Sequence, residues 1–245
     1  SLLNDSPTLL ISDLHLTPCR PHIAALFQRF LARGAGNAQA LYILGDLFDT
    51  WAGDDDLADP FNAEICAALA NLAATGTKIF FMAGNRDLLA ADQFAAAARL
   101  TFIEDPTVVT LAGVPTLLMH GDTLCTGDTD YLAFRATARS PAYQAAFLAK
   151  PLAERKALLA SMRAQSEAAK QKKDEAIMDA SPNAIADAFR QHPVTRIIHG
   201  HTHRQARHEH LIDSRPCERW VLGDWHEHGN ALTIDRNGCR WLDIR

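Results

Sequence analysis

Short apolar runs that alternate with helical patterns are the feature that most restricts how this chain can fold. In the first third, strands are expected at 8–12, 41–44 and 78–82, and helices at 21–33 and 61–74. Pro21 near the start of the first helix and Gly34 just after it are typical boundary residues. Because strands and helices alternate, the sequence predicts an α/β fold.

A long segment without a strand pattern divides the rest of the chain. Residues 126–192 read as several helices, with breaks at Pro141, Pro151 and Pro182 because proline is poorly tolerated inside a helix. Strands are expected before and after this segment, at 108–110, 115–119, 195–198, 219–222, 231–234 and 240–244. We therefore expect a core formed by 1–125 and 193–245, carrying a helical insertion at 126–192, here called the cap.

The charge of the cap differs from that of the core. The whole chain has a formal net charge of -5, which argues against a general nucleic-acid binder. Between Arg135 and Lys173 there are nine basic and two acidic residues, so this segment is +7 and the remainder is -12. The pattern favours attraction of the cap to an anionic substrate or membrane surface. A solvated helix face would give the same pattern.

Cysteine content and apolar runs indicate the compartment. The chain has five cysteines and no CxxC pair, which is typical of free, mostly buried thiols in a reducing environment. No run approaches the roughly 18 apolar residues of a spanning helix, and no signal-peptide pattern precedes the first apolar run. We expect a cytoplasmic protein, and these features leave peripheral membrane contact open.

Metal-ligand side chains directly follow five of the apolar runs, where sites gather in open α/β sheets. The segments are Ser12-Asp13-Leu14-His15, Gly45-Asp46-Leu47-Phe48-Asp49, Gly84-Asn85-Arg86-Asp87, His120-Gly121-Asp122 and His199-Gly200-His201-Thr202-His203. Carboxylate, amide and imidazole ligands together suit Mn, Fe or Zn better than Ca. Seven such ligands are too many for one tetrahedral ion. They suit two cations about 3.5–4 Å apart that clamp a phosphoryl group and activate water.

In this order the segments resemble the calcineurin-like metallophosphoesterase superfamily, whose pattern is DxH, GDxxD, GNH[DE], a later His and GHxH. The resemblance implies a two-sheet β sandwich flanked by helices. It places Asp13, His15 and His203 on the first metal, with Asp46 as the bridging carboxylate. It places Asn85, His120 and His201 on the second metal. Asp49 and Asp87 are expected to orient ligands, and His199 is expected to be structural.

Arg86 departs from this superfamily, which usually has a histidine after the asparagine, acting as a general acid or substrate contact. Arginine cannot donate a proton at useful pH, but it can grip phosphate oxygens with two N–H groups. A leaving phosphate, whose second pKa is about 6, does not need a proton donor. Arg86 therefore favours cleavage of a phosphoanhydride.

Longer phrases are similar to the UDP-2,3-diacylglucosamine diphosphatase family of lipid A biosynthesis. They include Gly53-Asp54-Asp55-Asp56, His120-Gly121-Asp122-Thr123-Leu124-Cys125-Thr126 and Ile198-His199-Gly200-His201-Thr202-His203-Arg204. The resemblance implies two Mn ions, water attack at the α-phosphorus, and release of UMP and diacylglucosamine 1-phosphate. An acylated UDP-sugar and the cytoplasmic face of the inner membrane are then the expected partners, and we expect a monomer.

The same resemblance assigns further roles by position. The catalytic residues would be Asp46, Arg86 and His120. The substrate-binding residues would be Asn85, Arg86, Asp128, Ser166, Lys170, Lys173 and His201. At Lys170 family members can carry a different polar residue.

Several residues keep two possible roles on sequence grounds. Apolar residues of the cap either pack its own core or line an acyl groove: Phe147, Leu148, Leu152, Leu158, Leu159 and Met162. Arg163 serves either phosphate binding or helix solubility, and Trp51 lines the cleft or packs. Four later histidines are read as surface residues: His208, His210, His226 and His228.

Rival functions are another phosphoesterase of the superfamily, such as a cyclic-nucleotide phosphodiesterase, nuclease or protein phosphatase, or a non-catalytic scaffold with the same fold.

Overall fold

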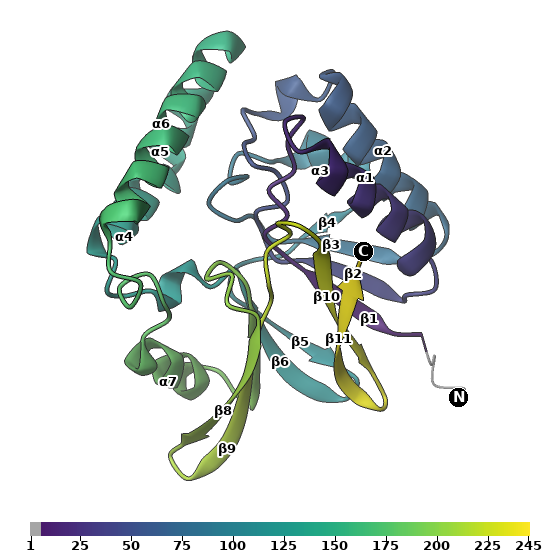
Figure 1. Ribbon diagram of the computed structural model, residues 1–245, viewed down its shortest axis with the longest axis vertical. Helices are drawn as coiled ribbons and strands as arrows, with labels where there is room; N and C mark the ends of the chain where they lie inside the picture. Colours follow the sequence, from purple (N-terminus) through teal and green to yellow (C-terminus); the bar gives the residue numbers. More distant parts are fainter. Residues whose placement is uncertain (1–5) are drawn as a thin grey trace.

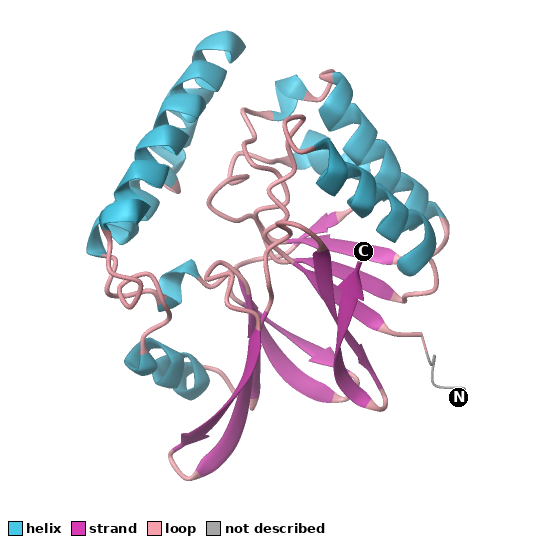
Figure 2. Ribbon diagram, viewed as in Figure 1, coloured by secondary structure: helices cyan, strands magenta, loops and turns pink. Residues whose placement is uncertain are grey.

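The computed structural model describes residues 6–245, and its strands form two sheets that pack face to face (Figures 1 and 2). The first sheet has the order β11-β10-β1-β2-β3-β4, and the second has the order β5-β6-β7-β9-β8. The strands are β1 (Thr8–Ile11), β2 (Ala40–Ile43), β3 (Lys78–Phe81), β4 (Thr101–Phe102), β5 (Thr107–Leu111), β6 (Val114–Met119), β7 (Arg196–His199), β8 (Ala206–Ile212), β9 (Arg215–Val221), β10 (Gly229–Asp235) and β11 (Gly238–Ile244). The α/β class and the two-sheet sandwich are therefore confirmed.

Helices cover the outer faces of both sheets. The first sheet is covered by α1 (Pro21–Arg29), its π-helical continuation η1 (Phe30–Gly34), α2 (Pro60–Ala74) and α3 (Asp92–Ala98). The second sheet is covered by α7 (Pro182–Gln191), whose Phe189 is buried with residues of β6 and β7. On β1, Leu9 and Ile11 face the helices and Leu10 faces the other sheet, because successive side chains of a strand point to opposite faces.

Three further helices stand beside the sandwich: α4 (Thr129–Ala138), α5 (Pro141–Leu148) and α6 (Leu152–Lys172) (Figure 1). The guanidinium of Arg155 attaches α6 to the core and is 3% exposed. It donates to the carbonyl oxygen of Ala52 at 2.6 Å and pairs with the Asp55 carboxylate. This contact holds the beginning of α6 against the loop that follows β2.

The expected helix breaks are confirmed, because α5 and α7 begin at Pro141 and Pro182 and Pro151 caps α6. Two strands and one α-helix of the described residues were not predicted: β4, β8 and α3. In β8, the mostly polar residues of Ala206–Ile212 alternate between half-buried and exposed positions. This edge strand therefore lacks the apolar run from which other strands were predicted. No helix among residues 6–245 combines the length and apolarity that crossing a membrane requires.

Candidate metal centre

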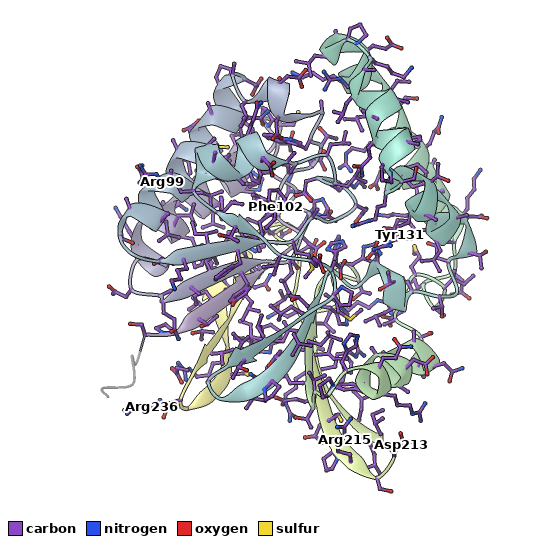
Figure 3. All side chains as sticks on the ribbon, turned by 180° about the vertical axis from the view of Figure 1, so that it is seen from behind. Arg99, Phe102, Tyr131, Asp213, Arg215 and Arg236 are labelled. Atoms are coloured by element: carbon purple, nitrogen blue, oxygen red, sulfur yellow. The ribbon has the colours of Figure 1, made fainter. Side chains whose placement is uncertain are left out.

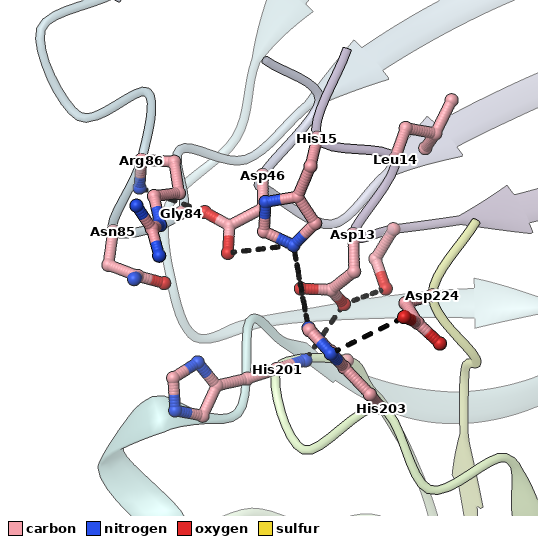
Figure 4. A network of polar contacts seen from close by, with 12 residues as sticks. Asp13, Leu14, His15, Asp46, Gly84, Asn85, Arg86, His201, His203 and Asp224 are labelled. Carbon is pink, nitrogen blue, oxygen red and sulfur yellow. Dashed lines mark hydrogen bonds and ion pairs between the residues drawn. The ribbon is translucent and has the colours of Figure 1, made fainter. Parts of the chain in front are cut away.

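The expected ligands meet where strands of both sheets end. Two groups of side chains each bring three potential ligand atoms within 4.8 Å of one another. The groups are Asp13 with His15 and His203, and Asp46 with His120 and His201. Figure 4 shows the first group converging beside Asp46, with Asn85 and Arg86 on the far side of that carboxylate. The loops after β1, β2, β3, β6 and β7 thus supply one site.

The first group is organised around a buried carboxylate. Asp13 Oδ2 accepts hydrogen bonds from Ser12 Oγ at 2.5 Å and from the backbone N–H of His201 at 2.9 Å. Asp13 Oδ1 is buried without a hydrogen-bond partner, and it lies 3.3 Å from His203 Nε2 and 3.8 Å from His15 Nε2. A buried carboxylate oxygen without a donor is costly, so this arrangement fits a cation shared by the three side chains.

The second group contains a histidine whose orientation is fixed. His120 Nδ1 lies 2.7 Å from the Leu44 carbonyl oxygen, and since a carbonyl only accepts, Nδ1 carries a proton. Its Nε2 therefore faces the site, 3.0 Å from Asn85 Oδ1 and 3.5 Å from Asp46 Oδ2. Burial would lower the pKa of His120, yet the carboxylates of Asp46 and Asp13 raise it to about 9. The cluster thus attracts positive charge to Nε2, as a metal site does.

Asp46 lies between the two groups. Its Oδ2 is 3.9 Å from His15 Nε2 and 3.5 Å from His120 Nε2. Its Oδ1 accepts a hydrogen bond from the backbone N–H of Arg86 at 2.9 Å. Burial, together with the nearby Asp13 and Asp87 carboxylates, raises the pKa of Asp46 to about 7. The position and the crowding of negative charge both suit a carboxylate that bridges two cations.

The backbone at the site is strained. Five of the seven expected ligands have φ between 48° and 71°, a region that residues other than glycine rarely adopt: Asp13, His15, Asp46, His201 and His203. Such strain persists only where surrounding structure imposes it, and it gathers at functional sites. Glycines permit the close approach, because a Cβ at Gly84 would collide with Asp46 Oδ1 and one at Gly200 with Asp13 Oδ2.

Asp87 holds the loop that carries Asp46. It is fully buried, and its Oδ1 accepts from the N–H groups of Gly84 at 2.8 Å and Asp46 at 3.2 Å. Its Oδ2 accepts from the N–H groups of Leu47 at 2.8 Å and Phe48 at 3.3 Å. One carboxylate therefore ties the loop after β2 to the loop after β3.

Two other carboxylates flank the histidines of the first group. Asp49 Oδ1 lies 3.9 Å from His15 Nδ1, and Asp224 Oδ2 lies 3.7 Å from His203 Nδ1. Carboxylates in this position orient a ligating imidazole through its other nitrogen. Asp224 was missed in the sequence, although Gly223-Asp224 follows β9 as the other Gly-Asp pairs follow their strands.

A buried polar cluster that the sequence did not reveal supports the second group from the side of α4. Asp122 Oδ2 accepts from the Tyr131 hydroxyl and from Arg135 Nε, both at 2.7 Å. Figure 3 places Tyr131 beside the junction of the two sheets, and its ring centroid is 5.5 Å from that of His201. The beginning of the cap therefore packs directly against an expected ligand.

The expected substrate residues of the cap lie on or beside α4 and α6, where several of them interact with one another or with Arg86. Asp128 accepts from the Tyr131 N–H as the N-cap of α4, and it pairs with Lys173 Nζ at 2.7 Å. Lys170 lies near Arg86 and Glu167, which both influence its pKa; that pKa is lowered first by desolvation and then by Arg86. Ser166 is half-buried on α6.

Arg86, in the loop after β3, and Arg163, on α6, both contact Glu167 of α6. Arg163 Nε pairs with Asp49 Oδ2 at 2.9 Å, so this arginine joins the cap to the residue that flanks His15. Arg86 Nη2 lies 3.6 Å from Glu167 Oε1 on the same helix. Arg163 is thus more than a solubilising residue.

Trp51 and His199 both have structural roles. Trp51 is 1% exposed and packs on Phe48 and Phe94 in the core. His199 is buried, with Nδ1 donating to the Gly200 carbonyl at 2.8 Å and Nε2 accepting from Arg219 at 2.9 Å. This histidine supports the loop that carries two expected ligands.

The later histidines are not members of the two ligand groups found among residues 6–245, and the apolar residues of the cap divide between packed and exposed positions. His208 and His210 lie on β8, and none of the four later histidines belongs to either ligand group among the described residues. In the cap, Phe147 and Leu159 join the core cluster, whereas Leu148 and Leu158 are exposed. Some apolar residues of the cap therefore pack, and others remain available to a ligand.

Comparison with known proteins agrees with this geometry. The family model of the calcineurin-like phosphoesterases matches residues 6–205. The chain is 50% identical over 230 residues to the UDP-2,3-diacylglucosamine hydrolase of Aromatoleum aromaticum, with 94% of each chain covered. It is 49% identical over 231 residues to the enzyme of the same name from Cellvibrio japonicus, covering 94% of this chain and 96% of that one.

A solved archaeal phosphodiesterase structure aligns with a TM-score of 0.50 at 11% identity, covering 97% of this chain and 99% of that chain. At this identity the likeness concerns the fold alone. It agrees with the two packed sheets described above.

Proposed function

The chain belongs to the calcineurin-like phosphoesterases and, within them, to the UDP-2,3-diacylglucosamine hydrolase family, and from this we propose how its own residues carry out the reaction. The substrate is UDP-2,3-diacylglucosamine of lipid A biosynthesis. Water attacks the α-phosphorus, and the products are UMP and 2,3-diacylglucosamine 1-phosphate. The observation that carries the proposal is the joint placement of the metal-ligand groups and Arg86 around Asp46.

Two Mn ions are the proposed cofactors. Asp13, His15 and His203 would hold one ion, and Asn85, His120 and His201 the other. Asp46 would be shared between the two ions. When bound, such ions polarise phosphoryl oxygens and lower the pKa of water. The protein fixes its ligands in advance, through the Leu44 carbonyl that orients His120 and the Asp87 carboxylate that holds the Asp46 loop.

Arg86 is proposed to stabilise the charge of the diphosphate during cleavage. Its backbone N–H is bound to Asp46, which fixes the loop, and its side chain is only 10% exposed, which restricts the guanidinium beside the two ligand groups. A fixed guanidinium aimed at developing negative charge lowers the barrier without needing to reorganise. No general acid is required, since the departing sugar phosphate leaves as a stable anion.

We further propose that residues 126–192 act as a cap that receives the sugar and its acyl chains. Asp128, Ser166, Lys170 and Lys173 would contact the polar part of the substrate. Four of the six exposed large hydrophobic residues among residues 6–245 lie in this segment: Phe134, Leu148, Leu158 and Ile177. Together with the +7 charge of 135–173, they support contact of a cytoplasmic monomer with the inner face of the membrane.

Activity on two substrates tests this proposal. Purified protein is assayed with Mn against UDP-2,3-diacylglucosamine and against UDP-N-acetylglucosamine, and UMP is measured. We expect Mn-dependent release of UMP from the acylated substrate at a much higher kcat/KM. Equal values for the two substrates would remove the acyl-binding role of the cap. Hydrolysis of cyclic nucleotides or phosphoproteins in preference to both would favour another phosphoesterase activity.

A further inference from the structure

Glu167 is an acidic residue in an otherwise basic part of the cap. Between Arg135 and Lys173 the only acidic residues are Glu154 and Glu167, against nine basic ones. Glu167 lies on α6, directly after Ser166 and one turn before Lys170. Its position places a negative charge where the proposed substrate brings negative phosphates.

The carboxylate of Glu167 is held by two arginines. Its Oε1 lies 3.6 Å from Arg86 Nη2 and 3.6 Å from Arg163 Nη1. Arg86 comes from the loop after β3, whereas Arg163 comes from the preceding turn of α6. One oxygen is therefore shared between a guanidinium of the core and one of the cap.

Both arginines have constraints besides Glu167. The side chain of Arg86 is 10% exposed and its backbone N–H is bound to Asp46, whereas Arg163 Nε pairs with Asp49 Oδ2 at 2.9 Å. Lys170 adds a third positive charge nearby, and its pKa is lowered first by desolvation and then by Arg86, with Glu167 acting in the opposite direction. Removing the carboxylate would leave an ordered group of cations that binds anions.

We propose that Glu167 occupies the phosphate-binding place of Arg86 and Arg163 in the free protein and that an incoming phosphate must displace it. This inference rests on the proposed function, because it assigns Arg86 to the phosphates of the substrate. The carboxylate side chain is 52% exposed and can swing into solvent when it is replaced. Glu167 thereby lowers the affinity for weakly bound anions, while a diphosphate at the metals competes more effectively.

The same helix offers a matched control. Glu154 also lies on α6, its side chain is also 52% exposed, and it pairs with Lys150 four residues away at 3.6 Å. Glu167 pairs with Arg163 at the same distance and spacing. The difference between them is the contact of Glu167 with Arg86. Glu154→Gln therefore removes the same charge and an ion pair of the same spacing while leaving the core arginine untouched.

Binding of inorganic phosphate to the Mn-loaded protein tests the proposal by calorimetry. Breaking a partly exposed ion pair changes an equilibrium by about two- to five-fold. We expect Glu167→Gln to tighten phosphate binding by that factor and Glu154→Gln to leave it unchanged. In Arg86→Ala protein, the gain from Glu167→Gln should disappear. Unchanged or weaker phosphate binding by Glu167→Gln, or a gain that persists without Arg86, would overturn the proposal.

A kinetic measurement separates this proposal from the proposed function. For the acylated UDP-sugar, Glu167→Gln should lower KM by about two- to five-fold, because the diphosphate of the substrate no longer has to displace a carboxylate from the arginines. If the wild type hydrolyses no acylated UDP-sugar, the proposed function fails, and the phosphate measurement still decides the role of Glu167. A raised KM would instead assign Glu167 to substrate binding and contradict its role as a competitor.

Discussion

Replacing Asp87 with asparagine should disturb both the stability of the fold and the metal centre. Each carboxylate oxygen of Asp87 accepts two backbone N–H bonds, from Gly84 and Asp46 at Oδ1 and from Leu47 and Phe48 at Oδ2. Asparagine has one acceptor oxygen, and its NH2 group must face one of the two pairs. Two N–H groups are then left buried without an acceptor and opposed by another donor.

The size of the effect follows from these two lost bonds. A hydrogen bond to a charged group contributes roughly 1.5–3 kcal/mol, so the free energy of unfolding should fall by about 3 kcal/mol or more. For a domain of this size, 1 kcal/mol changes Tm by roughly 2–4 °C, which predicts a fall of roughly 6–12 °C. Because Asp46 moves with its loop, Mn affinity should also fall by about ten-fold or more.

Thermal unfolding with a chelator present measures the loss of stability, and Mn titration of the same proteins measures the loss of metal affinity. Asp59→Asn is the matched control. Asp59 caps α2 with one oxygen, Oδ1, which accepts from Phe61 and Asn62 at 3.0 and 3.2 Å. Asparagine can keep both bonds and caps helices equally well. Equal, small shifts in Tm for Asp87→Asn and Asp59→Asn would refute this account of the loop.

Three further outcomes are expected. Arg86→Ala should lower kcat/KM for the acylated UDP-sugar by about 10²–10³. Arg86→Lys should recover only part of this loss, because one ammonium group cannot bind two phosphate oxygens as a guanidinium does. Near-wild-type kinetics of Arg86→Ala would exclude the charge-stabilising role. Mn at about 100 times its Kd should stabilise the wild type by about 2.7 kcal/mol for each bound ion, measured as the Mn-dependent rise of Tm. Asp13→Asn should gain much less, and equal rises would place the ions elsewhere. Arg155→Met should speed proteolytic cleavage of the cap, because α6 loses its contacts with Ala52 and Asp55, and unchanged cleavage would show that other contacts hold the cap.

The sequence could predict that the candidate ligands lie together, because short local motifs carry them. Asp13 and His15, or His201 and His203, each follow one strand, and parallel strands deliver their carboxyl ends to the same edge. The proline-marked helix breaks of the cap were predicted for a similar reason. Each depends on the covalent structure of one residue and not on distant contacts.

The features that sequence reasoning missed depend on contacts between distant segments. Glu167 lies 3.6 Å from Arg86, a residue far from it in the sequence, and no spacing rule predicts such a pair. In the sequence, Tyr131 and Asp122 resemble ordinary helix and turn residues. Their role follows from the contact of the Tyr131 hydroxyl with Asp122 and of the Tyr131 ring with His201. The strand β8 pairs with β9 along seven residues through its backbone, which carries no side-chain signal.

Hydrolysis in ¹⁸O-labelled water tests the central claim most directly. With Mn-loaded protein and UDP-2,3-diacylglucosamine, mass spectrometry of both products locates the incorporated oxygen. Attack at the α-phosphorus predicts the label in UMP and none in diacylglucosamine 1-phosphate. Label in the sugar phosphate would contradict the assigned site of attack, and it would reverse the direction in which the substrate lies between the metal groups and Arg86.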